Sequence, residues 1–333
     1  MITFNKFFAN KDYEIYFNTH TGVEIIKGYK DKEDPFSLYL PSLLDVGVMG
    51  HCKHKCPFCY QGHKNKPNMK IKDFKNIIDQ VKHHTNQVAL GGRGDPNHHE
   101  DFEEIVSYSH KNGVVPNYTT SGIDLTDKQI EISKMCGAVA VSDYEQQYTY
   151  SALKRFMDAG IKTNIHLIFS RNTYHKAMKI IYGYNAWVRY GKINVDIDRL
   201  NAVIFLLFKP AGAGQFLKWK PTDFHLSSFA NVVFKSKTKF KIGMDSCLIN
   251  KVLKYFEPTK LQKMSIDTCE GSRMSAYITP DMKMMPCSFA DETITSVPIK
   301  DKQDIEYIWN RSRKFKSFRK ELENDQQCCP LGL

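Results

Sequence analysis

Three cysteines stand close together early in the chain and have the spacing of metal ligands. Cys52, Cys56 and Cys59 follow a C-x3-C-x2-C pattern, and Phe58 directly precedes the last of them. Thiolates hold the irons of iron–sulfur clusters, and a cubane [4Fe–4S] cluster normally takes four of them. A loop that supplies three would leave one iron open, as catalytic zinc sites keep one position open. The spacing therefore predicts a [4Fe–4S] cluster that can bind a second molecule directly.

Zinc and a disulfide are the alternatives for this loop. A structural zinc site needs four closed ligands, so His51 or His54 would have to complete the set. A disulfide needs an oxidising compartment, and the residues after Met1 lack the apolar run of a signal peptide. We therefore expect a cytoplasmic protein that uses these cysteines for metal, with zinc as the alternative to the cluster.

The cysteine loop is similar to the signature of the radical S-adenosylmethionine (SAM) superfamily, in which SAM chelates the fourth iron. The resemblance implies that Cys52, Cys56 and Cys59 are catalytic and that Phe58 lies beside the cofactor. It also implies that one electron, from a donor of the flavodoxin or ferredoxin type, cleaves SAM to methionine and a 5′-deoxyadenosyl radical. That radical would then abstract a hydrogen atom from the substrate.

Short apolar segments and amphipathic helices alternate from residue 43 onward, which is the pattern of a parallel sheet. We expect an α/β fold, with a partial (β/α)6 radical SAM barrel in residues 41–235. A small β-hairpin segment, 1–40, would precede it, and a cysteine-bearing α+β extension, 236–333, would follow. The predicted strands are 43–49, 87–91, 114–119, 138–142, 162–169 and 202–208, and the predicted helices are 71–83, 100–110, 127–135, 148–159 and one from about 173.

Glycines and polar residues follow the predicted strands, and ligands of such folds gather at the C-terminal strand ends. Gly91-Gly92-Arg93-Gly94-Asp95-Pro96 resembles the family's G-G-E-P motif, which binds the SAM amino group, although Asp95 stands where the family usually has Glu. A plain glycine turn is the other interpretation. The residues that this resemblance assigns to SAM are Gly91, Gly92, Gly94 and Asp95.

The ends of the next three strands offer further SAM contacts. Thr119 and Ser121 belong to a turn similar to the family's T-N-G turn. Ser142, which we favour over Asp143, stands where the family often places a polar residue that contacts the ribose. After the fifth strand, the candidates for contact with the SAM carboxylate or ribose are Ser170 and Arg171.

The C-terminal third carries a second group of cysteines. Cys269 and Cys287 bracket a predicted hairpin with a Pro280-Asp281 turn. This run resembles the C-x9-15-G-x4-C pattern of SPASM/twitch extensions, with Met282 in place of the glycine. The resemblance implies one auxiliary [4Fe–4S] cluster with Cys328 and Cys329 as alternative ligands, and unligated thiols are the other interpretation. The candidate ligands are Cys247, Cys269, Cys287, Cys328 and Cys329.

Composition leaves the partner open. The net charge is +11, which favours an acidic partner and keeps RNA among the candidates, although the basic residues are spread along the chain. No stretch reaches the roughly 18 apolar residues of a membrane span. The SPASM/twitch resemblance implies a ribosomally made peptide or protein as the substrate, modified by cross-linking, epimerisation or a related reaction. RNA or nucleotide modification is the alternative, and a zinc-stabilised RNA-binding module is the non-enzymatic one.

Recognition of a precursor peptide would need a surface beyond the barrel. About 40 residues precede the predicted barrel, which looks too short for a fused leader-binding winged-helix domain. Segments 13–17 and 23–26 read as a β-hairpin, whose edge could accept a peptide strand. We therefore expect recognition through this hairpin, through the C-terminal extension or through a separate leader-binding protein.

Overall fold

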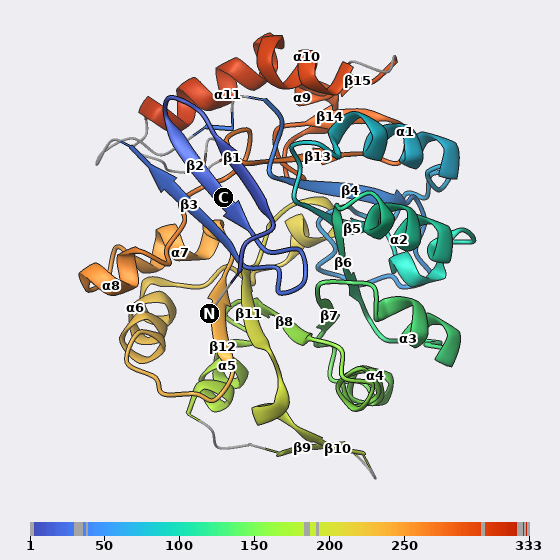
Figure 1. The fold of residues 1–333 in the computed structure, drawn as a ribbon. Helices are drawn as coiled ribbons and strands as arrows, with labels where there is room; N and C mark the ends of the chain where they lie inside the picture. The colour runs from blue at the N-terminus through green and yellow to red at the C-terminus, as the bar shows by residue number, and fades with distance from the viewer. Residues whose placement is uncertain are drawn as a thin grey trace.

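The computed structural model describes residues 3–29, 36–37, 39–182, 187–190, 193–300, 304–324, 329 and 331. Within these ranges, a ten-stranded sheet has the order β12-β11-β8-β7-β6-β5-β4-β13-β14-β15. The six predicted strands are present and pair in parallel with one another in chain order, which confirms the α/β class (Figure 1). They are β4 (Leu43–Met49), β5 (Gln87–Gly92), β6 (Val115–Thr120), β7 (Val139–Ser142), β8 (Thr163–Phe169) and β11 (Ala202–Leu207).

The predicted helices lie on the outside of the curved sheet (Figure 1). Alternate strand residues point toward the helices. In β8, Ile165 and Leu167 are therefore buried, whereas the alternating residues Asn164 and His166 are partly exposed on the inner face. The apolar core therefore lies between sheet and helices, and the inner face is less buried, with polar residues such as His166 beside apolar ones such as Ile168. The helices are α1 (Ile71–Val81), α2 (Phe102–Lys111), α3 (Asp127–Ser133), α4 (Gln147–Asp158) and α5 (Tyr174–Ile181).

The sheet is wider than the six predicted strands. A seventh strand, β12, extends one edge, and β13 pairs in parallel with β4 at the other side. The predicted C-terminal hairpin is β13 and β14, so segment 236–333 shares the sheet with the barrel. Because β12 spans only four residues, its sequence carries little periodic signal. The additional strands are β12 (Lys241–Met244), β13 (Ser275–Ile278), β14 (Lys283–Met285) and β15 (Val297–Pro298).

The N-terminal segment forms a small antiparallel sheet at the N-terminal ends of the parallel strands. The predicted hairpin is β2 (Tyr13–Phe17) and β3 (Glu24–Gly28), and β1 (Lys6–Ala9) adds a third strand. The Lys6 ammonium donates to the carbonyl oxygens of Thr85 and Gly113, at 2.9 and 3.2 Å, just before β5 and β6. This sheet therefore covers the end of the barrel opposite the C-terminal strand ends.

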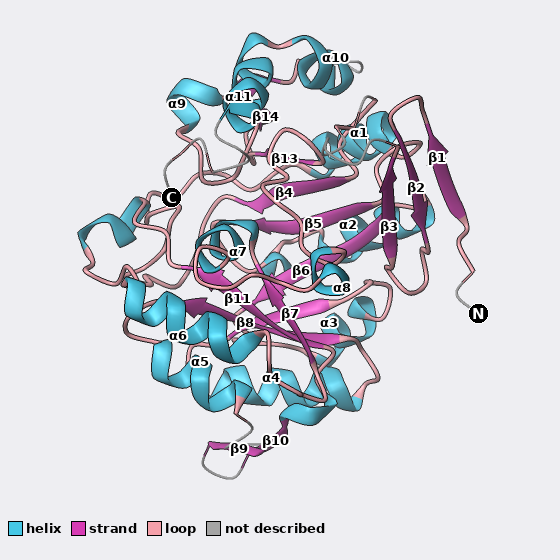
Figure 2. Ribbon diagram, turned by 90° about the vertical axis from the view of Figure 1, so that its left-hand side faces the viewer, coloured by secondary structure: helices cyan, strands magenta, loops and turns pink. Residues whose placement is uncertain are grey.

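The remaining helices lie around the sheet, and β9 and β10 form a separate two-stranded hairpin that projects from the molecule (Figure 2). Trp309 and Phe315, on two consecutive C-terminal helices, are fully buried against the core. In the described part of the chain, no helix has the length and apolar character needed to cross a membrane. These elements are β9 (Trp187–Tyr190), β10 (Ile193–Asp196), α6 (Asp223–Val233), α7 (Ser246–Val252), α8 (Lys260–Lys263), α9 (Glu292–Thr295), α10 (Asp304–Arg311) and α11 (Arg313–Asn324).

Candidate active site

The loop that carries the three cysteines leaves the C-terminal end of β4 and folds into tight turns. The Cys59 amide donates to the Cys56 carbonyl at 3.1 Å, and the Cys59 carbonyl accepts from the Ala213 amide at 2.9 Å. The Cys52 sulfur accepts from the His54 amide at 3.3 Å. These bonds hold the loop against the turn after β11, so the three thiols are placed where ligands of this fold gather.

Two glycines at the end of β5 allow this loop to pack against the neighbouring strand. A Cβ on Gly92, whose φ is +115°, would lie 2.3 Å from the Met49 carbonyl oxygen. A Cβ on Gly94 would lie 2.3 Å from the His51 carbonyl oxygen. By contrast, a Cβ on Gly91 would meet nothing within 4 Å. Gly92 and Gly94 thus serve the close approach of two backbone segments, while Gly91 leaves open space for a ligand.

We expect Gly94→Ala to reduce iron binding at the cysteine loop severely. The added methyl group would meet the His51 carbonyl at 2.3 Å, a distance that real Cβ atoms essentially never show, so the loop must shift. A displacement near 1 Å is enough to spoil a catalytic arrangement. Gly91→Ala is the matched control, since the same methyl group has free space there. The measurement is iron per chain after anaerobic reconstitution, and equal iron content in the two variants would contradict this account.

The three thiols influence one another electrostatically. Burial raises the pKa of Cys56 to about 11, and the neighbouring Cys59 and Cys52 add to the shift. Burial likewise raises the pKa of Cys52, with contributions from Asp95 and Cys59. Without a bound cation, the protonated thiols are therefore favoured over thiolates at this site. A bound cation would favour the thiolates instead.

Single-ion metal sites bring their ligand atoms close together. Tetrahedral zinc with Zn–S bonds near 2.3 Å brings its sulfurs to about 3.8 Å from one another. Within the described ranges, the one group of potential ligands that lie within 4.8 Å of one another is His99, Glu100 and Asp101. Both ring nitrogens of His99 bond to backbone groups, of Met69 and Asp101. The sulfurs of Cys52, Cys56 and Cys59 do not all lie within 4.8 Å of one another.

Asp95 connects the ends of two strands. Its carboxylate accepts from the Ser121 amide at 3.0 Å and from the Thr120 hydroxyl at 3.3 Å. The Ser121 hydroxyl in turn bonds to His54 of the cysteine loop at 3.3 Å. Asp95 and Ser121 are thus brought together with the cysteine loop. An aspartate, which is shorter than the family's usual glutamate, reaches its partners because they lie on the adjacent turn after β6.

Thr119 and Ser142 meet a histidine on the inner face of the sheet. The Thr119 hydroxyl lies 3.4 Å from Nδ1 of His166, and Ser142 is paired with His166 in the register of β7 and β8. Burial lowers the pKa of His166 to about 4, so the imidazole is neutral at neutral pH. Our sequence analysis missed His166, although its alternation with Ile165 and Leu167 marks it as an inner-face residue.

Phe58, Ser170 and Arg171 lie toward the turn before α5. The Phe58 ring is 5.7 Å from the rings of both Tyr144 and Trp219. The buried Ser170 hydroxyl bonds to Thr173 at 3.0 Å within its own turn. The Arg171 amide donates to the carbonyl of Trp219 at 3.0 Å. Ser170 and Arg171 remain predicted SAM contacts.

Four of the five C-terminal cysteines gather in a second place. A hydrogen bond to Cys329, followed by burial, raises the pKa of Cys247. Burial raises the pKa of Cys269 to about 11 and that of Cys287 to about 12, and both also interact with Cys329. All four line one cavity of about 700 Å³. Cys328 lies outside the described residues.

This second cysteine group combines a residue that follows β12, at one edge of the sheet, with residues that flank the β13–β14 hairpin near the other. Cys247 is on α7, directly after β12, whereas Cys269 and Cys287 flank the β13–β14 hairpin beside β4. Met282, in the place of the usual glycine, has a φ of +58°, so it adopts the left-handed conformation that glycine takes readily. Asp45 of β4 lines the same cavity, and burial raises its pKa to about 6.

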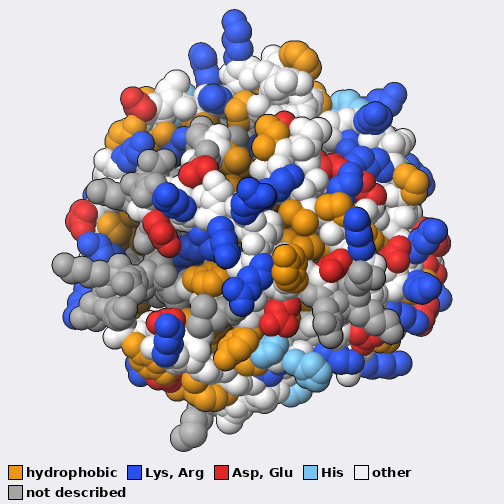
Figure 3. Space-filling view, turned by 90° about the horizontal axis from the view of Figure 1, so that it is seen from above, with side chains coloured by type: hydrophobic (Ala, Val, Ile, Leu, Met, Phe, Trp, Pro, Cys, Tyr) orange, Lys and Arg blue, Asp and Glu red, His pale blue; other side chains and the backbone are white. Residues whose placement is uncertain are grey.

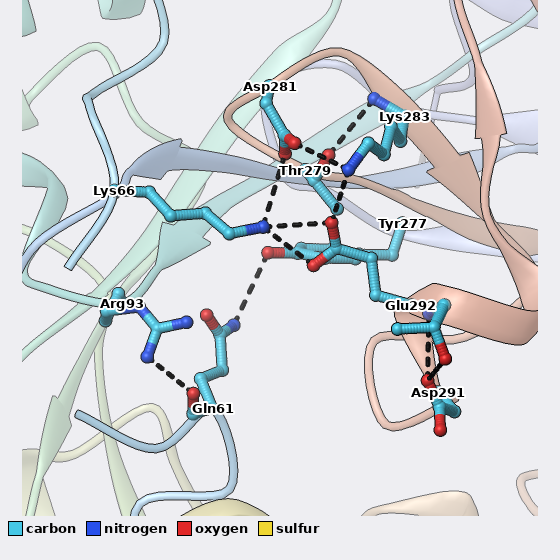
Figure 4. A network of polar contacts seen from close by, with 10 residues as sticks. Gln61, Lys66, Arg93, Tyr277, Thr279, Asp281, Lys283, Asp291 and Glu292 are labelled. Carbon is cyan, nitrogen blue, oxygen red and sulfur yellow. Dashed lines mark hydrogen bonds and ion pairs between the residues drawn. The ribbon is translucent and has the colours of Figure 1, made fainter. Parts of the chain in front are cut away.

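A network of ion pairs joins the cysteine loop to the C-terminal hairpin (Figure 4). The Lys66 ammonium lies 2.8 Å from the Glu292 carboxylate. The Lys283 ammonium lies 2.7 Å from Asp281 and 2.7 Å from Glu292. Beneath the network is a second cavity of about 350 Å³. This cavity is lined by Tyr60 and Gln61 of the cysteine loop and by Ser288 and Phe289, which follow Cys287.

Comparison with known proteins agrees with this arrangement. The radical SAM superfamily model matches residues 46–143, and the model of the SPASM iron–sulfur cluster-binding domain matches residues 269–330. SuiB of Streptococcus suis bound to the precursor peptide SuiA is 14% identical with a TM-score of 0.66, covering 88% of this chain and 71% of that chain. The enzyme anSMEcpe with bound AdoMet and Cp18Cys peptide is 13% identical with a TM-score of 0.58, covering 83% and 81%. At these identities, the likeness to solved structures shows the fold.

Proposed function

We propose that this chain, a radical SAM enzyme with a C-terminal SPASM domain, abstracts hydrogen from a ribosomally made peptide or protein. The observation that carries the proposal is a cavity of about 350 Å³ lined both by Tyr60, which follows Cys59, and by Ser288, which follows Cys287. The solved structures of similar fold include SuiB with its precursor peptide and anSMEcpe with a peptide. Cross-linking, epimerisation or a related change of the peptide is the expected outcome.

The chain's own residues would hold and orient the reactants. Cys52, Cys56 and Cys59 would bind the catalytic [4Fe–4S] cluster, which when bound supplies the electron that cleaves SAM. Gly91 leaves backbone space beside that loop. The neutral imidazole of His166, next to Thr119, offers a hydrogen bond without adding charge to the inner face.

The second cysteine site would suit products that are oxidised relative to the substrate. After one hydrogen atom has left, a cross-linked product requires the loss of one more electron and one more proton. Cys247, Cys269, Cys287 and Cys329 would hold an auxiliary cluster, whose chemistry when bound is electron uptake. The Asp45 carboxylate lines the same cavity, and burial raises its pKa to about 6, which makes it a stronger base than an ordinary aspartate and able to accept that proton.

The surface helps to choose among partners. Lys and Arg side chains are scattered over the face seen from above, with Asp and Glu between them (Figure 3). The described side chains of this face do not form the single-sign stripe typical of nucleic-acid binding. The N-terminal sheet covers the opposite end of the barrel from the cysteine loop. We therefore favour recognition of a peptide by the C-terminal region or by a separate leader-binding protein.

Isotope transfer tests the substrate class. We expect deuterium from a labelled candidate peptide, encoded by a short reading frame beside the gene, to appear in 5′-deoxyadenosine. The physical reason is that the abstracted hydrogen atom is carried by the adenosyl product, so the label reports the bond that was broken. Mass spectrometry of 5′-deoxyadenosine is the measurement. Deuterium transfer from labelled RNA or a labelled nucleotide, and from no peptide, would overturn the peptide assignment.

A further inference from the structure

The cavity between the cysteine loop and the C-terminal hairpin has a defined lining. Tyr60 and Gln61 of the loop form one wall, and Tyr277 and Phe289 of the C-terminal region form the other. The Tyr60 and Phe289 rings are in contact, with centroids 4.6 Å apart. Since Tyr60 directly follows Cys59, a molecule in this cavity would lie beside the catalytic loop.

The charged residues at the rim of this cavity mostly neutralise one another. Lys66 and Lys283 share the carboxylates of Asp281 and Glu292 in the network of Figure 4. The Asp291 carboxylate accepts from the Thr293 amide at 2.8 Å and caps α9. Two lysines and two carboxylates thus balance, and the capping aspartate is engaged with a helix end.

Arg93 is a further cation that lines this cavity and takes no part in these ion pairs. Its guanidinium donates to the Gln61 carbonyl oxygen, and no carboxylate of the described residues pairs with it. A guanidinium has five N–H donors, so donors remain free in the cavity that Arg93 lines. The side chain is half-buried, and a partly desolvated charge without a counter-ion costs stability. A carboxylate ligand would relieve that cost with two parallel hydrogen bonds.

The backbone holds Arg93 in place for this role. Its amide donates to the Met49 carbonyl at 2.9 Å, and the glycines on either side pack against the cysteine loop at distances that exclude any Cβ. The backbone position of Arg93 is therefore fixed close to the cysteine loop. Its positive charge lowers the pKa of Cys52, although the larger effect of burial raises that pKa.

We propose that Arg93 binds a carboxylate of the peptide substrate, an Asp or Glu side chain close to the residue that is modified. This inference rests on the proposed function and names a specificity determinant within it. The SAM carboxylate is a second source of the same chemistry. The peptide is favoured because the cavity is walled by the C-terminal hairpin, on the β13 side of β4. The polar inner-face residues Thr119, Ser142 and His166 lie across the sheet on β6, β7 and β8.

The test compares the peptide KM of the reconstituted wild-type enzyme with that of Arg93→Gln. Loss of a charge-assisted, partly buried hydrogen-bonded pair should raise the KM roughly 10- to 100-fold. Arg93→Lys, which keeps the charge but loses the two-pronged geometry, should lie between. Lys111→Gln is the matched control, because it removes one exposed cation at the far end of the barrel. Iron content checks that each variant is assembled.

A double-mutant cycle identifies the carboxylate. An Asp→Asn or Glu→Gln change in the peptide should raise the wild-type KM by the same factor and add little further to Arg93→Gln. An unchanged peptide KM in Arg93→Gln, with deuterium transfer intact, would overturn this inference alone. A larger change in the SAM dissociation constant than in the peptide KM would assign Arg93 to the SAM carboxylate and also overturn it. Absence of deuterium transfer from any peptide to wild-type enzyme would overturn both proposals.

Discussion

Replacement of Cys59 by alanine should abolish the production of 5′-deoxyadenosine. The methyl group of alanine offers no electron pair to iron, and a three-thiolate site that loses one ligand cannot keep both its cluster and an open iron. The backbone at this position should survive, because the bonds from Cys59 to Cys56 and Ala213 use only main-chain atoms. Loss of activity would therefore report a lost ligand.

The measurement is 5′-deoxyadenosine released from SAM under anaerobic reducing conditions. Cys136→Ala is the matched control, since Cys136 packs against the core and lies apart from both cysteine groups, with a pKa raised by burial. It should keep near wild-type production. Full 5′-deoxyadenosine formation by Cys59→Ala would refute the assignment of the catalytic cluster.

A chain in which Cys52, Cys56 and Cys59 are all alanine should still bind iron. The second cysteine group is separate, because Cys247, Cys269, Cys287 and Cys329 line their own cavity and influence one another's pKa. Four thiols are the usual ligand set of a cubane, so about four irons per chain should remain after reconstitution. Iron analysis and the absorption spectrum of the purified variant measure this.

Two further substitutions on this background separate the adjacent C-terminal cysteines. Cys329→Ala should remove most of the remaining iron, since Cys329 is hydrogen-bonded to Cys247 and interacts with Cys269 and Cys287. Cys328→Ala is the matched control and should retain the iron. If the triple-alanine chain already binds none, the auxiliary cluster does not exist and the four thiols are unligated.

Some features of this protein could be predicted because they depend on neighbours in the sequence. The three-cysteine loop is one, since a spacing of a few residues decides which thiols one tight turn can present. The six central strands are another, because each is a short apolar run and the first five are each followed by a helical period. The same local logic predicted the C-terminal hairpin, with its turn at Pro280-Asp281.

Other features depend on residues that meet only in the folded chain. β12 has four residues and becomes a strand by pairing with β11. The role of Asp95 depends on the turn after β6, and that of Gly94 depends on the carbonyl of His51. These partners are supplied by other strands, so neither residue type nor local spacing reveals them.

The same distinction separates the two cysteine sites. Cys52, Cys56 and Cys59 are brought together by one turn, so their grouping is already contained in the sequence. Cys247 and Cys329 are 82 positions apart, as 329 minus 247 gives, and they meet because the fold brings α7 and Cys329 to one cavity. The spare charge of Arg93 is likewise a tertiary property. It exists because folding pairs Lys66 and Lys283 with Asp281 and Glu292 and leaves the guanidinium facing a cavity.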